Sequence, residues 1–287
     1  MTVAEALLAI SRSDVPAALE ALNEAATDQA GGSVAPALRS FLLSSNESGV
    51  YDEPSAFESF INNGDNPRLY ANTIDRVAGT HRRSQPEAVL DLGCGDGRVT
   101  AATLQASTTS IELVEPSAEL LQIATGRLGT EAQPRQLTVH QTDAQRFLAG
   151  AGADRNWDLV QSTFAMHTLP HDERAVVLAA FAARTTQLVM VEFDVPSFTD
   201  RSIEHAEYAA ERYEHGLDEY FHHPEVIRGF LMPVLVGQFD PSQPRHTFEQ
   251  SNHEWMSDLK AAGFSEVRSE LVANYWWGPA MLIHATN

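Results

Sequence analysis

The feature that most constrains the fold of this chain is a regular alternation of two sequence patterns between residues 85 and 195. Short apolar runs, typical of buried strands, are separated by segments with the three-to-four-residue spacing of amphipathic helices. The expected strands are 88–92, 110–114, 136–140, 159–162 and 187–193, and the expected helices are 98–105, 118–128 and 172–183. Such alternation is typical of a parallel sheet with helices on both faces, so the sequence predicts an α/β fold.

Two regions outside this alternation have a different character. Residues 1–80 show a helical spacing of apolar side chains and predict an N-terminal helical cap. Residues 196–247 are rich in aromatic residues and histidine, and they predict a helical insertion that forms a lid. The chain then returns to a helix and two strands, whose short connection suits an antiparallel pair. The core is therefore expected to comprise residues 81–195 and 248–287.

The charge balance excludes several classes of function. The chain has 287 residues with 39 acidic and 19 basic side chains, which give a formal net charge of −20. Lysine occurs once, at Lys260 near the end of an expected helix, which fits neither a Schiff-base enzyme nor a P-loop. Nucleic-acid binding is disfavoured, because its affinity comes largely from cationic side chains that neutralise phosphates.

Cysteine content and hydropathy indicate the compartment. Cys94 is the single cysteine, so no intramolecular disulfide can form and nothing indicates an oxidising environment. The N-terminal residues lack the basic region of a signal peptide, and no run of about 18 apolar residues indicates a membrane span. We expect a cytoplasmic protein without a membrane partner.

The segment 89–98, Val-Leu-Asp-Leu-Gly-Cys-Gly-Asp-Gly-Arg, joins a strand to a helix through a glycine loop. Glycines at such a junction let the backbone approach a nucleotide-like ligand closely. The spacing is G-x-G-x-G, and Arg98 stands where the dinucleotide pattern G-x-G-x-x-G requires glycine. Asp91 and Asp96 would repel the pyrophosphate that a dinucleotide places at a helix N-terminus. The same carboxylates suit an ammonium group, so the loop predicts a nucleoside that carries an amino acid.

This segment resembles motif I of the class I S-adenosylmethionine-dependent methyltransferases, of the type that acts on small molecules. The resemblance covers about residues 85–195 and 248–287. It implies a Rossmann-like fold with a seven-stranded, mostly parallel sheet whose last strand is antiparallel, and S-adenosylmethionine as the cofactor. Within the motif it assigns cofactor binding to Asp91, Gly93, Cys94 and Gly95. Cys94 is expected to be a small filler, because no adjacent base is visible that would make it a nucleophile.

Three further segments match the family in the same order. Glu115, next to Pro116 at the end of the second strand, resembles the acid that binds the ribose hydroxyls. Asp143 and Ala144, after the third strand, resemble the residues that bind the adenine amino group and ring. Ser162, in the fourth strand, lies in the segment that lines the methionine portion. From the residues alone, Glu115 and Asp143 could each instead cap the helix that follows.

The candidate for a catalytic base is His167, in the loop after the fourth strand. Ligands of open α/β folds bind at this carboxyl edge of the sheet, and a base helps when the acceptor is a hydroxyl or an ammonium group. Packing of the loop is the alternative role of this histidine. The chain has 11 histidines, but their spacing gives no recognisable ligand cluster, so no metal is expected.

The insertion is expected to determine acceptor specificity. Its first helix has an apolar and aromatic face opposite an acidic ridge, which comprises Glu204, Glu207, Glu211, Glu214 and Asp218. Several side chains together predict a lid, with cation–π contacts to a sulfonium, and they are Tyr208, Tyr213, Tyr220, Phe221 and His222. Weaker candidates for the same cover are Tyr51, Phe57 and Tyr70. For each aromatic residue, a place in the core is the alternative.

The sequence thus predicts transfer of a methyl group from S-adenosylmethionine to a small organic acceptor, in specialised metabolism rather than on RNA or protein. The acidic insertion favours an acceptor that is neutral or cationic. Two rival functions remain: an enzyme of the same fold that cyclises or cleaves S-adenosylmethionine, and a non-catalytic protein that binds it. A homo-oligomer is compatible with the sequence.

Overall fold

The structure is a computed structural model that describes residues 1–27, 32–44, 54–129, 136–243 and 245–287. The chain forms two compact units. The sheet unit comprises Leu69–Val195, Phe248–Asn274 and Pro279–Asn287, and the helical unit comprises Met1–Arg68, Pro196–Thr247 and Tyr275–Gly278. Within the ranges that the structure describes, no helix combines the length and apolar character needed to cross a membrane.

The sheet unit is built on one seven-stranded sheet in the order β3-β2-β1-β4-β5-β7-β6. The strands are β1 (Ala88–Leu92), β2 (Ser110–Val114), β3 (Gln136–His140), β4 (Trp157–Thr163), β5 (Thr185–Phe193), β6 (Glu266–Ala273) and β7 (Ala280–Thr286). Strands β1 to β5 pair in parallel, whereas β7 is antiparallel to both β5 and β6. The predicted α/β fold and its antiparallel last strand are therefore confirmed.

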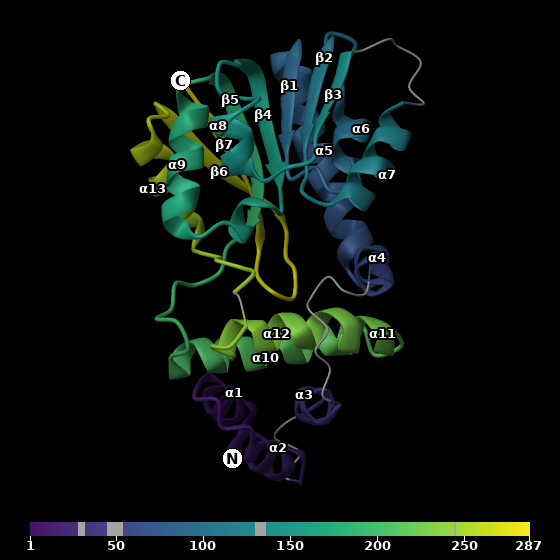
Figure 1. Ribbon diagram of the computed structural model, residues 1–287, viewed down its shortest axis with the longest axis vertical. Coiled ribbons are helices and arrows are strands. Elements are labelled where there is room, and N and C mark those ends of the chain that lie inside the picture. Colours follow the sequence, from purple (N-terminus) through teal and green to yellow (C-terminus); the bar gives the residue numbers. More distant parts are fainter. Residues whose placement is uncertain (28–31, 45–53, 130–135, 244) are drawn as a thin grey trace. The chain divides into compact units, whose positions relative to one another are not determined.

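Helices cover both faces of this sheet (Figure 1). They are α5 (Asn66–Ser84), α6 (Arg98–Thr103), α7 (Ala118–Leu128), α8 (Ala144–Ala149), α9 (His171–Ala182) and α13 (Asn252–Ala262), with the short turn η1 (Met166–Thr168). Helices α8, α9 and α13 share the larger apolar cluster, which includes Trp157, Phe181 and Trp255. On the opposite face α7 packs around Ile111 and Leu121. Successive side chains of a strand point to opposite faces, so each strand contributes to both layers.

Side-chain caps fix where the helices begin at the carboxyl edge of the sheet. The hydroxyl of Ser117 accepts a hydrogen bond from Leu120 N at the start of α7, and Asp143 caps α8 in the same way. At α13, Ser251 and Glu254 form a capping box. The positions that follow β2 and β3 are thus held by local hydrogen bonds.

The helical unit has its own apolar core, which includes Leu7, Leu22, Leu38, Leu217 and Phe239. Its helices are α1 (Val3–Ser11), α2 (Val15–Thr27), α3 (Val34–Leu43), α4 (Pro54–Asn62), α10 (Ile203–Glu219), α11 (Pro224–Val226) and α12 (Met232–Phe239), with a π-helical turn η2 (Ile227–Leu231). Helices α1, α2 and α3 pack in sequence, and α10 packs against α1. The unit therefore combines the N-terminal helices with the insertion.

The boundary between the two units falls within α5. The sequence predicts one helical cap over residues 1–80, but from Leu69 onward α5 belongs to the sheet unit. The reason is its buried face, where Val77 and His81 are fully buried and His81 Nε2 lies 2.8 Å from Gln161 Oε1 in β4. Conversely Tyr275–Gly278, in the connection between β6 and β7, belongs to the helical unit.

Candidate active site

The loop between β1 and α6 contains three glycines in left-handed backbone conformations, with φ angles of 69° at Gly93, 54° at Gly95 and 71° at Gly97. A Cβ on Gly93 would lie 2.3 Å from Ala165 Cβ, and one on Gly97 would lie 2.8 Å from Ala124 Cβ. At Gly95, apart from the residue itself and its two chain neighbours, no described atom lies within 4 Å of the corresponding position. The loop is therefore packed at its two ends and presents open backbone at its centre.

Hydrogen bonds and the burial of Cys94 hold this loop against β2. The N–H groups of Gly93 and Cys94 donate to Val114 O over 2.8 and 3.3 Å. The Cys94 side chain packs against the apolar cluster between β2 and α7. Burial, and then the charges of Asp91 and Glu115, raise the pKa of the Cys94 thiol. The protonated thiol is a poor nucleophile.

Asp91, at the end of β1, is the centre of a buried network of hydrogen-bonded side chains, which is called the relay below. Its Oδ2 accepts hydrogen bonds from Gln161 Nε2 at 2.8 Å and from the Thr100 hydroxyl. Its Oδ1 is buried, and no described group hydrogen-bonds to it. Burial raises the pKa of Asp91 to about 6, although the hydrogen bonds from Thr100 and Gln161 act in the opposite direction. A carboxylate with a buried, unpaired oxygen favours a cationic partner.

His81 completes the relay by orienting the Gln161 amide. Since Gln161 Nε2 donates to Asp91, its Oε1 must accept the 2.8 Å hydrogen bond from His81, whose Nε2 therefore carries hydrogen. Burial lowers the pKa of His81, against the effect of its hydrogen bond with Gln161. A neutral His81 thus keeps the amino end of Gln161 directed at Asp91. Neither His81 nor Gln161 was among the residues predicted from the sequence.

Asp96, the second carboxylate of the glycine loop, is in a different environment. It pairs with Arg98 Nη2 at 2.8 Å and with Arg127 Nη1 at 3.1 Å. Two arginines therefore neutralise Asp96. Of the two carboxylates that the sequence analysis offered to a ligand's ammonium group, Asp91 is the one with an unpaired oxygen.

Glu115, at the carboxyl end of β2, lies against the open centre of the loop. Its carboxylate accepts hydrogen bonds from Gly95 N at 3.1 Å and from Ser117 N at 2.9 Å. Burial raises the pKa of Glu115, and these two hydrogen bonds oppose the rise. Pro116, beside it, is exposed. The structure thus brings the predicted ribose-binding acid next to Gly95.

Asp143 lies after the neighbouring strand, β3, and is the N-cap of α8. Its Oδ1 accepts a hydrogen bond from Arg146 N at 2.7 Å, and its Oδ2 lies 3.4 Å from Arg146 Nε. Ala144 is buried as the first residue of the helix. Capping occupies one carboxylate oxygen, so Oδ2 retains the capacity to accept a hydrogen bond from an amino group.

The residues present fit the cofactor that the motifs predict. Ser162 Oγ, like Asp91 Oδ1, is buried and has no hydrogen-bond partner in the described part of the chain. Buried polar groups in native proteins are nearly always hydrogen-bonded, and these two oxygens are available to a polar ligand. The open backbone at Gly95 and the adjacent Glu115 provide space and an acceptor for a sugar.

Phe164, directly after β4, is a residue of this region that sequence reasoning missed. Its φ angle of 53° is left-handed, a conformation that costs a non-glycine residue about 1–3 kcal/mol and that clusters at functional sites. Its ring stacks on Phe193 at 5.0 Å between centroids and meets the edge of Tyr70 at 5.8 Å. Tyr70 therefore belongs to an aromatic cluster at the carboxyl ends of β4 and β5.

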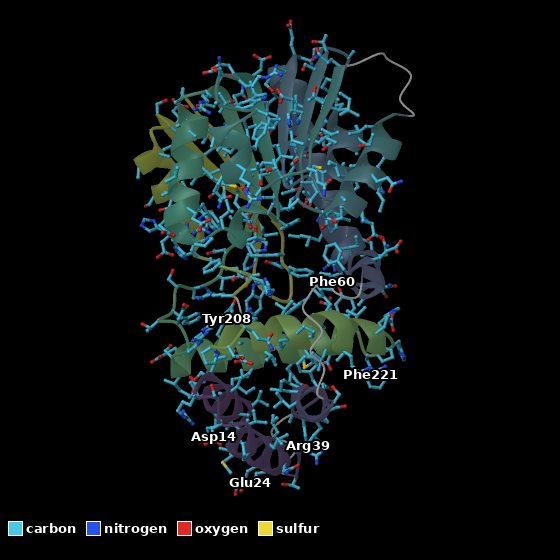
Figure 2. All side chains as sticks on the ribbon, viewed as in Figure 1. Asp14, Glu24, Arg39, Phe60, Tyr208 and Phe221 are labelled. Carbon is cyan, nitrogen blue, oxygen red and sulfur yellow. The ribbon has the colours of Figure 1, made fainter. Side chains whose placement is uncertain are left out.

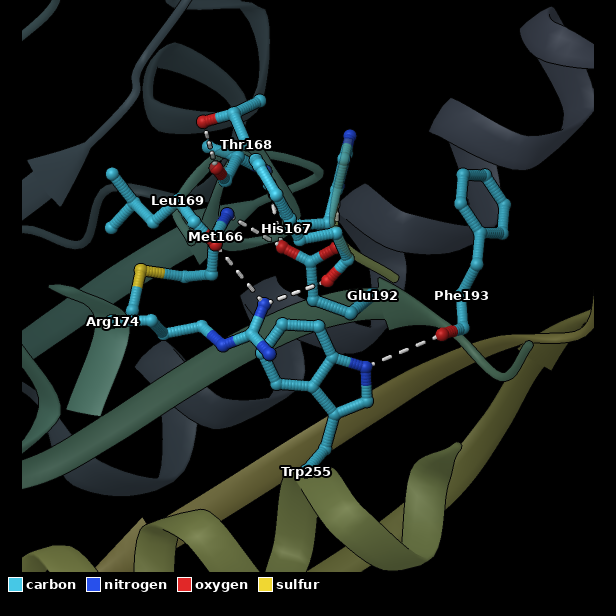
Figure 3. A network of polar contacts seen from close by, with 10 residues as sticks. Met166, His167, Thr168, Leu169, Arg174, Glu192, Phe193 and Trp255 are labelled. Carbon is cyan, nitrogen blue, oxygen red and sulfur yellow. Dashed lines mark hydrogen bonds and ion pairs between the residues drawn. The ribbon is translucent and has the colours of Figure 1, made fainter. Parts of the chain in front are cut away.

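His167 is held by a buried carboxylate that the sequence analysis did not identify, Glu192 of β5. His167 Nδ1 lies 2.8 Å from Glu192 Oε2, while Oε1 accepts hydrogen bonds from Ala165 N and Met166 N at 3.1 and 2.7 Å (Figure 3). Burial lowers the pKa of His167, but the charge and hydrogen bond of Glu192 outweigh it, so the net pKa is raised. With Nδ1–H donating to Glu192, Nε2 of the neutral ring is the proton acceptor.

Arg174 supports the turn that carries His167 from behind. Its guanidinium lies 4.1 Å from the Trp255 ring centroid (Figure 3). It also donates to Phe248 O at 2.8 Å and to the side chain of Gln250. Phe248 N in turn donates to His167 O at 2.6 Å. The turn is therefore fixed both through its side chain and through its backbone.

Two predicted lid residues lie in the core of the helical unit. Tyr213 is 2% exposed and packs edge-on against Trp276 and Trp277, with ring centroids 5.4 and 5.6 Å apart. Tyr220 is fully buried, and its hydroxyl accepts a hydrogen bond from Asn66 Nδ2 at 2.6 Å. Burial raises the pKa of the Tyr220 hydroxyl. Both tyrosines thus stabilise the unit itself.

The other predicted lid residues are closer to its surface. Tyr208 is half-buried and donates to Trp277 O at 2.6 Å, whereas Phe221 is 70% exposed (Figure 2). His222, the next residue in the chain, is also exposed. Tyr51 lies outside the described residues. The acidic ridge of α10 is exposed except at Glu214, whose carboxylate accepts hydrogen bonds from the backbone at the start of α3.

The family follows from comparison with known proteins. A sequence profile of the methyltransferase domain matches residues 63–228, more than half of the chain, so the protein belongs to this family. With the sheet order and the motifs in their expected order, it is a class I S-adenosylmethionine-dependent methyltransferase, an enzyme family whose methyl donor is S-adenosylmethionine.

Individual relatives agree with this assignment. An uncharacterized methyltransferase of Bacillus cereus ATCC 14579 is 26% identical over 210 residues, which are 71% of this chain and 92% of that protein. Among solved structures, a protein of Nostoc punctiforme PCC 73102, provisionally named an O-methyltransferase, is 16% identical with a TM-score of 0.53 over 76% of this chain and 57% of that one. Magnesium protoporphyrin IX methyltransferase from Synechocystis PCC 6803, solved with bound S-adenosylhomocysteine (SAH), is 16% identical with a TM-score of 0.50 over 77% of this chain and 84% of that one. At these identities the two structures establish similarity of fold and nothing further.

Proposed function

We propose that this enzyme transfers the methyl group of S-adenosylmethionine to a small organic acceptor of specialised metabolism. The observation that carries the proposal is the turn after β4, which joins two features. Its Ala165 packs directly on Gly93 of the glycine loop, and its His167 is a base held by the buried Glu192. A proton acceptor and a cofactor loop are thereby built into one rigid structure.

The cofactor-binding roles follow from the unpaired groups of the sheet unit. Asp91 Oδ1 would accept from the ammonium group, and Ser162 Oγ would contact the methionine portion. Glu115 would exchange its backbone hydrogen bonds for the ribose hydroxyls, and Asp143 would accept from the adenine amino group. The walls of the cofactor site would be formed by Gly93, Cys94, Gly95, Pro116 and Ala144. When bound, S-adenosylmethionine supplies a methyl group on a positively charged sulfur.

His167 would take the proton that an acceptor hydroxyl or ammonium loses. Its Nδ1–H donates to Glu192, so Nε2 receives the proton and Glu192 stabilises the imidazolium that forms. The aromatic cluster of Phe164, Phe193 and Tyr70 would exclude water from the methyl group and present ring faces to the sulfonium.

Acceptor choice is assigned to the insertion, residues 196–247. Tyr208 and His222 have surface available for contact, whereas Tyr213 and Tyr220 would shape the unit from within. Phe248, where the chain re-enters the sheet unit after the insertion, donates its N–H to His167 O. The exposed acidic ridge favours an acceptor without negative charge.

The test combines calorimetry with product analysis. Purified protein should bind SAH, and Asp91→Ala and Glu115→Ala should each weaken that binding by at least about tenfold, a loss of about 1.4 kcal/mol. Incubation with S-adenosylmethionine and a panel of neutral and cationic hydroxyl and amine acceptors should yield SAH and a methylated product. Formation of methylthioadenosine instead would favour a cyclase or lyase, and tight binding without turnover of any acceptor would favour a non-catalytic protein.

A further inference from the structure

We propose that the sheet unit holds a second binding site, for a polyvalent oxyanion such as the phosphoryl group of a small molecule, between α5 and strands β6 and β7. This site shares no residue with the cofactor loop, and it does not depend on the proposed function. Three observations support this proposal: a cavity, the concentration of arginines around it, and the lack of a carboxylate partner, within the described part of the chain, for two of those arginines.

The cavity has a volume of about 480 Å³, within the range of small-molecule sites. Helix α5 contributes Arg76, Arg82 and Arg83, and the sheet contributes Arg268 and His284. The absence of a side chain at Gly79 lets the Arg83 guanidinium lie close to the helix backbone, because a Cβ there would lie 3.3 Å from Arg83 Nη1. The same helix turns its opposite face, with His81, toward β4.

The charge around this cavity is opposite to that of the whole chain. Among 19 basic and 39 acidic residues, four arginines gather here against two carboxylates, Asp75 and Glu270. Each carboxylate reaches one arginine at 3.9 Å, Asp75 pairing with Arg82 and Glu270 with Arg76. All four of these side chains are largely exposed, so the pairs are weak.

Arg83 and Arg268 are the unneutralised members of the cluster. Over the ranges that the structure describes, neither has a carboxylate within ion-pair distance, and Arg83 Nη2 donates only to Thr80 Oγ1 at 3.2 Å. The half-buried His284 lies beside them, and burial first, then the charges of Arg268 and Arg83, lower its pKa, while Glu270 opposes them. The positive potential at this point is therefore not cancelled by the protein.

The chemistry of arginine selects the ligand. A guanidinium presents donors in a planar fork that matches the oxygens of a phosphoryl or carboxylate group, and two unpaired forks suit an anion of more than one charge. Asp75 and Glu270, which also line the cavity, would accept hydrogen bonds from hydroxyl groups of the same ligand. A phosphorylated small molecule satisfies both features better than a free monovalent anion.

The experiment is calorimetric titration of the full-length chain with inorganic phosphate, pyrophosphate and ribose 5-phosphate at low salt. We expect pyrophosphate or ribose 5-phosphate to bind with a Kd below about 1 mM and inorganic phosphate more weakly. The double variant Arg83→Ala/Arg268→Ala should lose at least about tenfold in affinity. Arg12→Ala removes an equally exposed arginine outside the cavity and should bind as the wild type does.

The double variant should retain its Tm and its affinity for SAH, since neither arginine belongs to the proposed cofactor site. Absence of binding by the wild type up to about 10 mM of every probe would overturn the proposal. So would an equal loss in Arg12→Ala, which would indicate diffuse charge attraction. A self-association that the double variant abolishes, without any anion binding, would instead assign the cluster to contact between copies of the chain.

Discussion

Replacing Gly95 with alanine tests where the cofactor binds. The residue has a φ angle of 54°, and no described atom lies within 4 Å of the place where the new Cβ would stand. Placing alanine in a left-handed backbone conformation destabilises the folded state by about 1–2 kcal/mol. Alanine also lowers the conformational entropy of the unfolded chain, which offsets about 0.4–1 kcal/mol of that loss. We therefore expect Gly95→Ala to lower the free energy of unfolding by about 1 kcal/mol, a decrease in Tm of about 2–4 °C.

The effect of Gly95→Ala on cofactor binding should be larger than its effect on stability. The new methyl group occupies open space beside the Gly95 N–H that donates to Glu115, where the ribose is proposed to bind. Isothermal titration calorimetry with SAH should show a loss of at least about tenfold, which corresponds to about 1.4 kcal/mol.

Gly93→Ala is the matched control, because its φ angle of 69° is similar but its Cβ would lie 2.3 Å from Ala165 Cβ. Overpacking adds about 1–3 kcal/mol to the cost of the backbone conformation, so its Tm should fall further than that of Gly95→Ala. Thermal unfolding without ligand and calorimetry well below the Tm separate the two effects. Wild-type affinity for SAH in Gly95→Ala would refute the placement of the cofactor, and equal Tm losses would refute the packing argument.

Three further outcomes follow from the buried polar groups. The pKa of Asp91, raised to about 6, means that this carboxylate loses its charge as the pH falls, so affinity for SAH should decrease as the pH drops through about 6. Asp91→Asn should abolish that dependence and weaken binding at neutral pH by about 1.5–3 kcal/mol, as measured by calorimetry across pH. His81→Phe frees the Gln161 amide to turn its oxygen toward Asp91, so the pH midpoint of SAH binding should move upward, and an unchanged midpoint would contradict the relay. Glu192→Gln should lower the pKa of His167, visible by NMR titration, and shift the acid limb of methyl transfer to lower pH while the rate falls, because the base must be unprotonated. Glu192 stabilises the folded protein by pairing with charged His167. This contribution is present below the ordinary histidine pKa and is lost as the pH rises through the raised pKa of His167. If the Tm of the wild type and that of Glu192→Gln depended on pH in the same way, the pairing would be contradicted.

The sheet could be predicted from the sequence because its strands are short apolar runs bounded by polar residues. The expected ranges 88–92, 110–114 and 136–140 coincide with β1, β2 and β3. Parallel strands also place their carboxyl ends at one edge, so residues that follow successive strands converge there whatever the detailed packing. Glu115 and the glycine loop were accordingly both predicted to bind the cofactor, and in the structure Gly95 N donates to Glu115.

The partners of the site residues could not be predicted, because they depend on which side chains meet across layers. Glu192 lies in an apolar run of β5, and Gln161 in a similar run of β4. A buried polar residue in such a strand signals a pairing, since an unpaired one is costly, but the sequence does not say with what. The partner of Glu192 is a turn after a different strand, and that of Gln161 is a helix that precedes the sheet.

The arginine cluster shows a similar limit for charge. A net charge of −20 is a sum over the chain, and it correctly describes the exposed ridge of α10. The potential that a ligand experiences, however, decays over about 10 Å at ordinary ionic strength, so it depends on the few groups around each cavity. Arg83 and Arg268 belong to segments far apart in sequence, and folding places both of them on one cavity. From the net charge of the chain alone, a cation would be expected to bind there. An acidic protein can therefore combine a cofactor site built on carboxylates with a separate site for an anion, since each site is governed by the few charged groups around it.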